Sequence, residues 1–495
     1  MGLRERDRAA PGAGDPAPPS APRRSGDLRR MLALAVALAA LVGFARLAAP
    51  EHSSSRLGVG ASEGAGAAPE AGDPAGRPPR AGPPEMLLRR LDPSTLADVP
   101  ANLLLMGPSD RPFPSDDGAL LAVPDFQGID IGEVVVVDAR TFRPVATVRL
   151  EGSPITGLLG FTPEADAIIV QRRTGRGQTL SRHPLDPREG TTSVELPEPL
   201  RVDAEQTAVL GRGRVALLTT DRTGDDGESR RWTARVLVAD LLEERVVVDL
   251  PLPQVRADPV AEVLRDAPLY FPGLAWDEPR ERLYLAHADT RRLTVVDLAS
   301  GRVEAEADLG TRARDTEQLA AGARRMRNAA LSPDGARLYV GGRDVVPRAD
   351  PPDRPLGLSV IDTATLTEVA HLRLLSESGE LSPDGRWLAW TSYTAVPVTD
   401  IERADGVGFS RVGLLDTISL QQVALLGNGY RSSYALGFAQ DSGFFYLQSD
   451  DGEGGFVVRA HALPSLEQTA ERRLPGDAWF EPRGAYLREA GLGAS

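Results

Sequence analysis

Cysteine and lysine are both absent from this chain of 495 residues. Without cysteine the chain has no disulfide, no thiolate nucleophile, no Cys-ligated metal and no site for a lipid on an N-terminal cysteine. Because lysine is missing as well, all 56 basic residues are arginine. Together with 50 glycines and 41 prolines, this usage is typical of a GC-rich bacterial genome, which indicates origin rather than function.

Basic residues are outnumbered by acidic ones, and histidine is scarce. The 70 acidic residues give a formal net charge of −14, and nucleic-acid binding needs a basic surface, so the balance argues against a nucleic-acid partner. The five histidines are spread over the tether, turns and strands: His52, His183, His287, His371 and His461. Because they do not converge, we expect neither a His-based catalytic triad nor a His-cluster metal centre. No haem-attachment motif or phosphate-cradling glycine loop is present, so no cofactor and no metal are predicted.

A long hydrophobic run occurs near the N-terminus, where Met31 to Ala45 are apolar and follow Arg29 and Arg30. With the flanking residues, 31–49 just reach the length of a membrane span, which predicts one hydrophobic helix acting as a signal anchor, or alternatively a cleaved signal peptide. Arginines before the run place residues 1–30, a disordered segment, in the cytoplasm and the rest outside it. Residues 50–85, rich in Pro, Gly and Ala, form a linker. The expected location is therefore a bacterial cytoplasmic membrane with the folded part periplasmic or at the cell surface, or secretion if the signal is cleaved.

The rest of the chain repeats two phrases. Residues 331–340 (LSPDGARLYV) return as residues 381–390 (LSPDGRWLAW), and each copy is followed by a second phrase, SVIDTATL at 359–366 and GLLDTISL at 413–420. A period of about fifty residues made of strand, tight turn, strand, loop, strand, turn and strand is the signature of a β-propeller blade. The fold class predicted is therefore all-β, a β-propeller over residues 86–490.

Weaker copies of both phrases set the number of blades. The domain opens on a second phrase without a first one, near residues 88–96, and ends on a first phrase without a second one, near residues 479–487. The simplest arrangement has the N- and C-terminal strands share one blade, which closes the ring and removes free sheet edges. Seven complete blades and this shared one make eight, with seven as the alternative if a terminal fragment lies outside the ring.

The phrases resemble the YVTN and TolB-like families of bacterial propeller repeats, in which Ser-Pro-Asp-Gly joins the inner strands and Ile-Asp-Thr marks the outer turn. The resemblance covers about residues 86–490 and is strongest over residues 328–426. It implies a propeller outside the cytoplasm and implies no particular activity. Within the phrases, we expect the turn aspartates to bond backbone amides rather than bind metals. These are Asp334, Asp362, Asp384 and Asp416.

Length variation is concentrated on one face of the predicted propeller. The short hairpin turns lie on one face, whereas the long connections lie on the other: residues 124–133, 219–233, 341–357 and 391–411 within blades, and 251–272 and 310–327 between blades. Insertions on one face of a repeat protein usually form its binding surface. Two acidic segments, around residues 221–228 and 450–453, lack calcium-loop spacing and are expected to be solvated loops.

Six residues just before inner strands are the candidate ligand-binding residues at the mouth of the central channel. They combine arginine, carboxylate, amide and hydroxyl groups that could hold a polar or anionic ligand. They are Tyr270, Arg327, Asn328, Glu380, Arg431 and Ser432. A water-filled channel without a specific ligand is the alternative.

A propeller fold by itself does not determine an activity. The leading hypothesis is a non-catalytic binding or scaffold module, tethered to the membrane, that engages a protein, peptide or glycan partner in the cell envelope through its long loops. The alternative is a lactonase-like hydrolase with its site at the mouth of the channel, in which Glu380 or a channel arginine would be essential. Catalytic residues are not identifiable from the sequence.

Overall fold

The computed structural model of the chain describes residues 86–99, 104–106, 112–127, 130–150, 155–174, 177–197, 207–223, 231–258, 269–309, 319, 322–345, 353–372, 379–394, 409–427, 433–476 and 478–490. All of them belong to the unit formed by residues 75–495. The predicted N-terminal segment, hydrophobic helix and linker (1–30, 31–49 and 50–85) lie outside the described residues. In the part of the chain that is described, no helix has the length and apolar character needed to cross a membrane.

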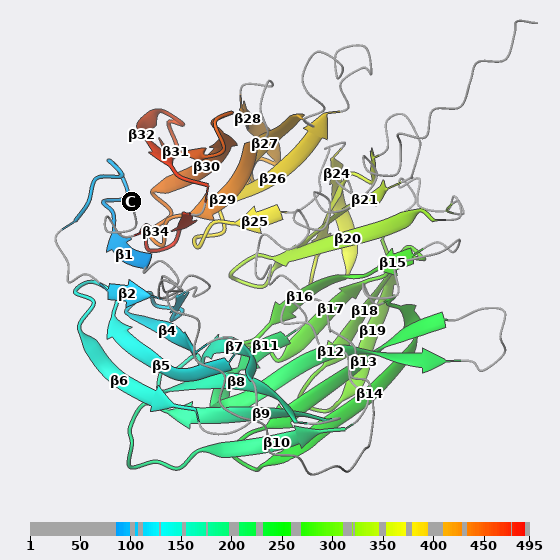
Figure 1. Cartoon of the computed structure of the whole chain (residues 1–495). Coiled ribbons are helices and arrows are strands. Elements are labelled where there is room, and N and C mark those ends of the chain that lie inside the picture. Colours follow the sequence, from blue (N-terminus) through cyan, green and yellow to red (C-terminus); the bar gives the residue numbers. More distant parts are fainter. Residues whose placement is uncertain are drawn as a thin grey trace, which may run out of the picture. The chain divides into compact units, whose positions relative to one another are not determined.

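The described residues form eight antiparallel sheets, which are the blades of an eight-bladed β-propeller (Figure 1). Blade 1 consists of β3 (Phe113–Pro114), β4 (Leu120–Gln127), β5 (Asp130–Asp138) and β6 (Pro144–Arg149). Blade 2 consists of β7 (Ile155–Phe161), β8 (Ala167–Thr174), β9 (Gly177–Pro184) and β10 (Thr192–Leu196). Blade 3 consists of β11 (Thr207–Leu210), β12 (Arg214–Thr223), β13 (Arg231–Asp240) and β14 (Arg245–Arg256), with the 3-10 turn η2 (Gly211–Gly213) between its first two strands.

The remaining complete blades follow in chain order. Blade 4 consists of β16 (Gly273–Asp277), β17 (Arg282–Ala286), β18 (Arg292–Asp297) and β19 (Arg302–Asp308). Blade 5 consists of β20 (Arg324–Leu331), β21 (Arg337–Val345), β23 (Leu358–Asp362) and β24 (Thr367–Leu372), to which the short strands β15 (Leu269–Phe271) and β22 (Asp353–Pro355) are added. Blade 6 consists of β25 (Gly379–Leu381), β26 (Trp387–Thr394), β27 (Phe409–Asp416) and β28 (Gln421–Leu426). Blade 7 consists of β29 (Ser433–Phe438), β30 (Phe444–Asp450), β31 (Phe456–Ala462) and β32 (Gln468–Leu474).

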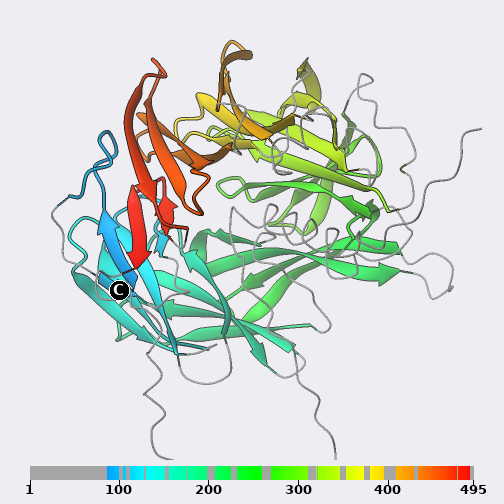
Figure 2. The same cartoon turned by 45° about the horizontal axis from the view of Figure 1, so that its top comes forward.

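The eighth sheet joins the two ends of the domain and is called the closing blade here. Its strand order is β2-β1-β34-β33, so the N-terminal strands β1 (Met86–Arg90) and β2 (Leu104–Met106) form its outer half. The C-terminal strands β33 (Trp479–Glu481) and β34 (Tyr486–Ala490) form its inner half. Five residue pairs connect β1 to β34, and both views show the blue strand beside the red one (Figures 1 and 2). The predicted eight blades and the shared closing blade are thus confirmed, and the seven-bladed alternative is wrong.

The second and third strands of each blade read as apolar runs because both faces of a blade are covered by its neighbours. Leu293, Val295 and Val296 of β18 are buried, whereas residues of the outermost strand β19 are mostly exposed. Packing between blades also involves the strand aromatics, and Trp390 and Tyr339 share one buried cluster between blades 5 and 6. A sheet buried on both faces loses the alternation of polar and apolar residues that marks a half-exposed strand.

Several connections that the sequence suggested were loops are partly paired strand. β12 and β13 stay in register as far as Thr223 opposite Arg231, and β26 and β27 as far as Thr394 opposite Phe409. The β4–β5 and β20–β21 ladders are lengthened in the same direction. Backbone pairing carries no side-chain pattern of its own in these polar segments, which is why the sequence suggested loops. We call the four paired extensions, in blades 1, 3, 5 and 6, the hairpin arms.

Candidate functional site: a cavity beside the closing blade

A cavity of about 210 Å³ lies where the inner hairpin turns of four successive blades meet. Blade 6 contributes Glu380, Leu381 and Pro383, blade 7 contributes Phe438 and Gln440, the closing blade contributes Arg483, and blade 1 contributes Asp116. We call it the closure cavity. It lies at the face of the short turns, opposite the hairpin arms, because each of its residues stands at or next to the turn between the first and second strands of a blade.

The turns around the cavity take their shape from local hydrogen bonds. In blade 1, the Asp117 carboxylate accepts bonds from the Ser115 hydroxyl at 2.6 Å and the Ala119 amide at 2.9 Å. These donors stabilise the charged form, so the Ser115 hydroxyl above all lowers the pKa of Asp117. In blade 6, Asp384 receives the same pair of bonds from Ser382 and from the amide of Arg386. Asp116 and Pro383, one position earlier, are therefore held in place at the rim of the cavity.

Hydrogen bonds between blades hold these turns against one another. The side-chain amide of Gln440 donates to the carbonyl of Asp116 at 3.0 Å, and the backbone amide of Gln440 donates to the carbonyl of Arg483 at 3.1 Å. The Ser442 hydroxyl accepts a bond from the backbone amide of Asp384 at 3.0 Å. Blades 6, 7, 1 and the closing blade are thus connected through the cavity wall, which makes the cavity largely pre-formed.

Glu380 reaches the cavity because residue 437 of the next blade is glycine. Gly437 has φ = +135°, and a Cβ there would lie 2.9 Å from a carboxylate oxygen of Glu380 and 3.0 Å from the ring of Pro482. A side chain at this position would therefore occupy the space in which the carboxylate lies. The same geometry places the Glu380 carboxylate close to Pro482, the residue that precedes Arg483 in the turn of the closing blade. Groups of opposite charge thus converge on one small space.

Tyr270 lies in a different environment. It belongs to β15, which runs parallel to β20 of blade 5, and its side chain is buried. The guanidinium of Arg256 stacks over its ring at 4.6 Å from the centroid. Asp258 accepts bonds from the Tyr270 amide at 2.8 Å and from Nε of Arg256 at 2.9 Å. Burial raises the pKa of both Asp258 and Tyr270, because it disfavours their charged forms.

A buried ion pair lies on the next strand. Arg325, 1% exposed, donates to both carboxylate oxygens of Asp344 at 2.7 and 2.9 Å, which is the two-bonded geometry that arginine favours. Arg327 and Asn328 follow on the same strand β20, and their backbone approaches Gly273 so closely that a Cβ there would lie 2.9–3.1 Å from it. Arg327 is buried as well.

The structure describes four of the six residues that the sequence grouped at one channel mouth. Tyr270 and Arg327 are buried among the strands of blades 4 and 5, Asn328 lies beside them, and Glu380 lies in the closure cavity. Arg431 and Ser432 lie outside the described residues. The role of all six as ligand-binding residues stays a prediction, and so does the hydrolase alternative.

Sequence reasoning missed Asp116, Gln440 and Arg483 as site residues. All three stand in inner hairpin turns that the repeat pattern does identify, so the signal was their shared position in the repeat. In the acidic segment at residues 450–453, Asp450 and Asp451 accept bonds from the amides of Gly452 and Glu453. Among the described residues, no three His, Asp or Glu side chains are grouped so as to hold a metal ion.

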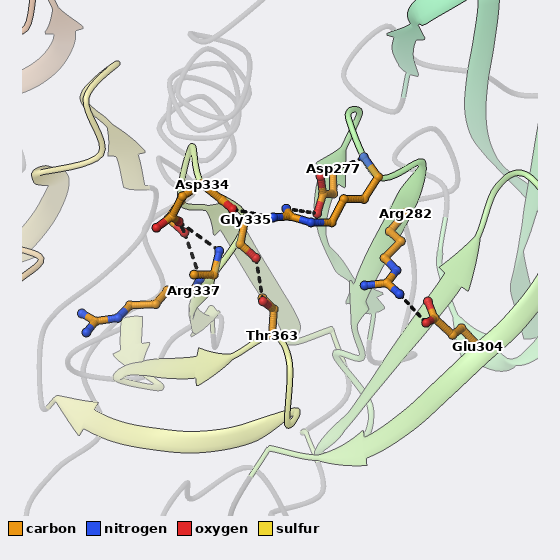
Figure 3. A network of polar contacts seen from close by, with 10 residues as sticks. Asp277, Arg282, Glu304, Asp334, Gly335, Arg337 and Thr363 are labelled. Atoms are coloured by element: carbon orange, nitrogen blue, oxygen red, sulfur yellow. Dashed lines mark hydrogen bonds and ion pairs between the residues drawn. The ribbon is translucent and has the colours of Figure 1, made fainter.

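The face of the short turns is also connected blade to blade away from the cavity. Arg280 of blade 4 donates to the carbonyl of Asp334 in blade 5 at 2.7 Å, and Thr363 donates to the carbonyl of Gly335 at 2.6 Å (Figure 3). Arg337 continues the series by donating to the carbonyl of Thr417 in blade 6 at 2.6 Å. The predicted hydrogen bonding of the turn aspartates to backbone amides is confirmed here, since Asp334 accepts a bond from the amide of residue 336.

No family model and no curated protein matches this chain. Solved structures do match it. A dihydro-heme d1 dehydrogenase, NirN, in complex with DHE is 13% identical, with 84% of this chain and 76% of that chain covered and a TM-score of 0.45. A eukaryotic initiation factor is 10% identical, with 82% and 98% covered and a TM-score of 0.44. The β-propeller domain of Cps50 (Swd1) from Myceliophteria thermophila is 12% identical, with 82% and 98% covered and a TM-score of 0.36. Likenesses this remote carry no argument about a ligand, an activity or a partner.

Proposed function

We propose that this protein is a non-catalytic binding or scaffold propeller that engages a protein, peptide or glycan partner through its hairpin arms. In this proposal residues 31–49 tether the propeller to a bacterial cytoplasmic membrane and the propeller lies outside the cytoplasm. Membership of the YVTN or TolB-like families is part of the same proposal and rests on the repeat phrases alone.

The observation that carries the proposal is the unequal length of the ladders. In blade 6, residues 391–394 of β26 pair with residues 409–412 of β27, whereas β25 reaches only Trp390 and β28 only Val412. Among the described residues of this blade, no strand lies beside either edge at the end of the arm. Unpaired backbone groups at a strand edge are the usual means by which an extended peptide adds to a sheet. In blade 3 the feature is one-sided: β12 continues to Thr223 beyond its pairing with β11, which ends at Leu217, whereas β14 accompanies β13 as far as Thr233.

The arms can be tested by capture from an envelope extract with the full chain. In the test variant, residues 393–410 are replaced by Asn-Gly, which keeps Thr391 opposite Val412 and closes the ladder with a two-residue turn. The matched control is Ile418→Ser, which changes a 72% exposed residue on the opposite face. We expect a partner that the wild type and the control capture and the shortened chain does not. Equal capture by all three chains would refute the role of the arms.

The proposed location has a direct test because the chain has no native cysteine. One variant carries Ser300→Cys in an exposed turn of blade 4, and a second carries Ser20→Cys in the segment expected in the cytoplasm. In intact spheroplasts, a membrane-impermeant maleimide should label position 300 at once and position 20 only after lysis. Labelling in the reverse order would contradict the orientation, and labelling of neither site before lysis would contradict the location outside the cytoplasm.

A further inference from the structure

We propose that the closure cavity binds a small zwitterion of amino-acid size, with its ammonium group toward Glu380 and Asp116 and its carboxylate toward Arg483. This site lies on the face opposite the hairpin arms, so it is a second binding function that does not depend on the first. The argument rests on the size of the cavity, on its charges and on the rigidity of its walls.

Size limits the ligand to a few non-hydrogen atoms. A volume of about 210 Å³ equals that of roughly seven water molecules in the liquid. It lies below the roughly 300–1,000 Å³ of pockets that enclose drug-sized ligands. The space therefore has room for a molecule with the dimensions of an α-amino acid.

Charge selects a ligand that carries both signs. Two carboxylates, Asp116 and Glu380, and one guanidinium, Arg483, are among the seven lining residues. They come from three different blades. An ammonium group gains charge-assisted hydrogen bonds from the carboxylates, and a carboxylate gains them from the guanidinium. A ligand of one sign would gain such bonds from only one of these two kinds of group.

Apolar residues complete the lining. Leu381, Pro383 and Phe438 supply carbon surface next to the charged groups, and Phe438 is 1% exposed and packed against Phe445 at 5.1 Å between ring centroids. A small apolar side chain on the ligand would lie against this surface. The lining therefore combines three apolar residues with four polar or charged ones.

Binding would also strengthen the closure of the ring. The walls come from blades 6, 7 and 1 and from the closing blade, whose halves are opposite ends of the chain. A ligand that contacts Glu380, Asp116 and Arg483 at once joins these blades in the closed ring only, and a ligand that binds one state stabilises it by mass action. The same ligand should therefore slow hydrogen exchange of the β1 and β34 amides.

The test uses the full chain and a panel of the twenty L-α-amino acids as probes, with thermal unfolding and titration calorimetry as readouts. At least one probe should bind saturably and raise the unfolding temperature. Glu380→Gln and Arg483→Gln should each weaken that probe about tenfold or more, since each removes a charge-assisted bond. The matched controls are Glu453→Gln and Arg473→Gln, which change exposed charges of blade 7 outside the cavity and should bind as the wild type does.

Two analogues of the best probe separate the contributions of its charges. The decarboxylated amine and the deaminated acid should each bind at least tenfold more weakly than the amino acid. The proposal is overturned if no probe binds, if both cavity variants bind as the wild type does, or if the amine alone binds as tightly as the amino acid. Arg483 is exposed in a turn, so its variant keeps the test valid even if Glu380→Gln fails to fold. Binding by the chain with the shortened blade 6 arm should be unchanged, which distinguishes this proposal from the proposed partner site.

Discussion

We predict that weakening the packing of the closing blade opens it locally, because no covalent bond joins β1 to β34. Leu88 of β1 is fully buried in a cluster with Leu121 and Val137 of blade 1 and Tyr486 of β34. Leu88→Ala removes buried carbon from the contact between the closing blade and blade 1. Such a substitution costs about 2–5 kcal/mol in a packed core. The N-terminal strands have no chain connection to β34, so this loss should appear first as local opening of the blade.

Hydrogen exchange measures that opening directly. If the opening free energy falls by about 2–5 kcal/mol, the protected amides of β1 and β34 should exchange roughly 30-fold to several thousand-fold faster. The matched control is Leu180→Ala in β9, which is equally buried but belongs to a blade whose strands are consecutive in the chain. It should destabilise blade 2 and leave exchange in β1 and β34 close to that of the wild type. If Leu88→Ala leaves these amides unchanged while Leu180→Ala accelerates exchange in its own blade, the closing blade does not hold the ring.

Three further predictions concern buried and turn-forming charges. Burial lowers the pKa of His183 and His287 from 6.5 to about 4, so between these pH values the unfolded chain binds more protons than the folded one. The urea midpoint should therefore fall as the pH is lowered from about 6.5 to 4. His287→Gln should reduce this dependence of the midpoint on pH, and an unchanged dependence would refute the role of the buried histidine. Asp344→Leu should cost about 3–5 kcal/mol by removing the carboxylate that balances the charge of the buried Arg325, and adding Arg325→Met should restore most of it; no recovery would contradict this account. Asp334→Ala should cost about 1 kcal/mol in a thermal melt, since it removes turn hydrogen bonds and no ligand contact; a loss several times larger would point to another role.

The sequence predicts the blades well because their signals are local. Asp334 and Asp384 form turns with partners two residues away, so the Ser-Pro-Asp-Gly phrase identifies each inner hairpin without any knowledge of the fold. The count of eight follows from the order of such phrases, and the shared closing blade follows from the two incomplete ones. These are inferences about connectivity, which a linear pattern contains.

Contacts between residues that are far apart in the sequence are not predicted by such local patterns. Asp344 pairs with Arg325 across a ladder, and Tyr270 contacts Arg256 from β15, a short strand that precedes blade 4 in the chain but pairs with β20 of blade 5. Nothing in the spacing of these residues selects one partner among so many arginines and acidic residues. Tyr270 and Glu380 stand at similar positions in the repeat, but Tyr270 is buried beside Arg256 and Glu380 borders the closure cavity.

The two faces of the propeller differ in how their backbone groups are satisfied, and this difference organises both proposals. On the face of the short turns, side chains such as Arg280, Arg337 and Gln440 donate to carbonyls of another blade, so each turn is held by its neighbours. On the opposite face, the end of the blade 6 arm is paired, among the described residues, only between its own two strands. A cavity for a small ligand requires the first arrangement, because a displacement of about 1 Å would break its hydrogen bonds. The arrangement of the arms suits the recognition of a large partner in the proposed function, because arms of different lengths present strand edges that the ring itself does not need.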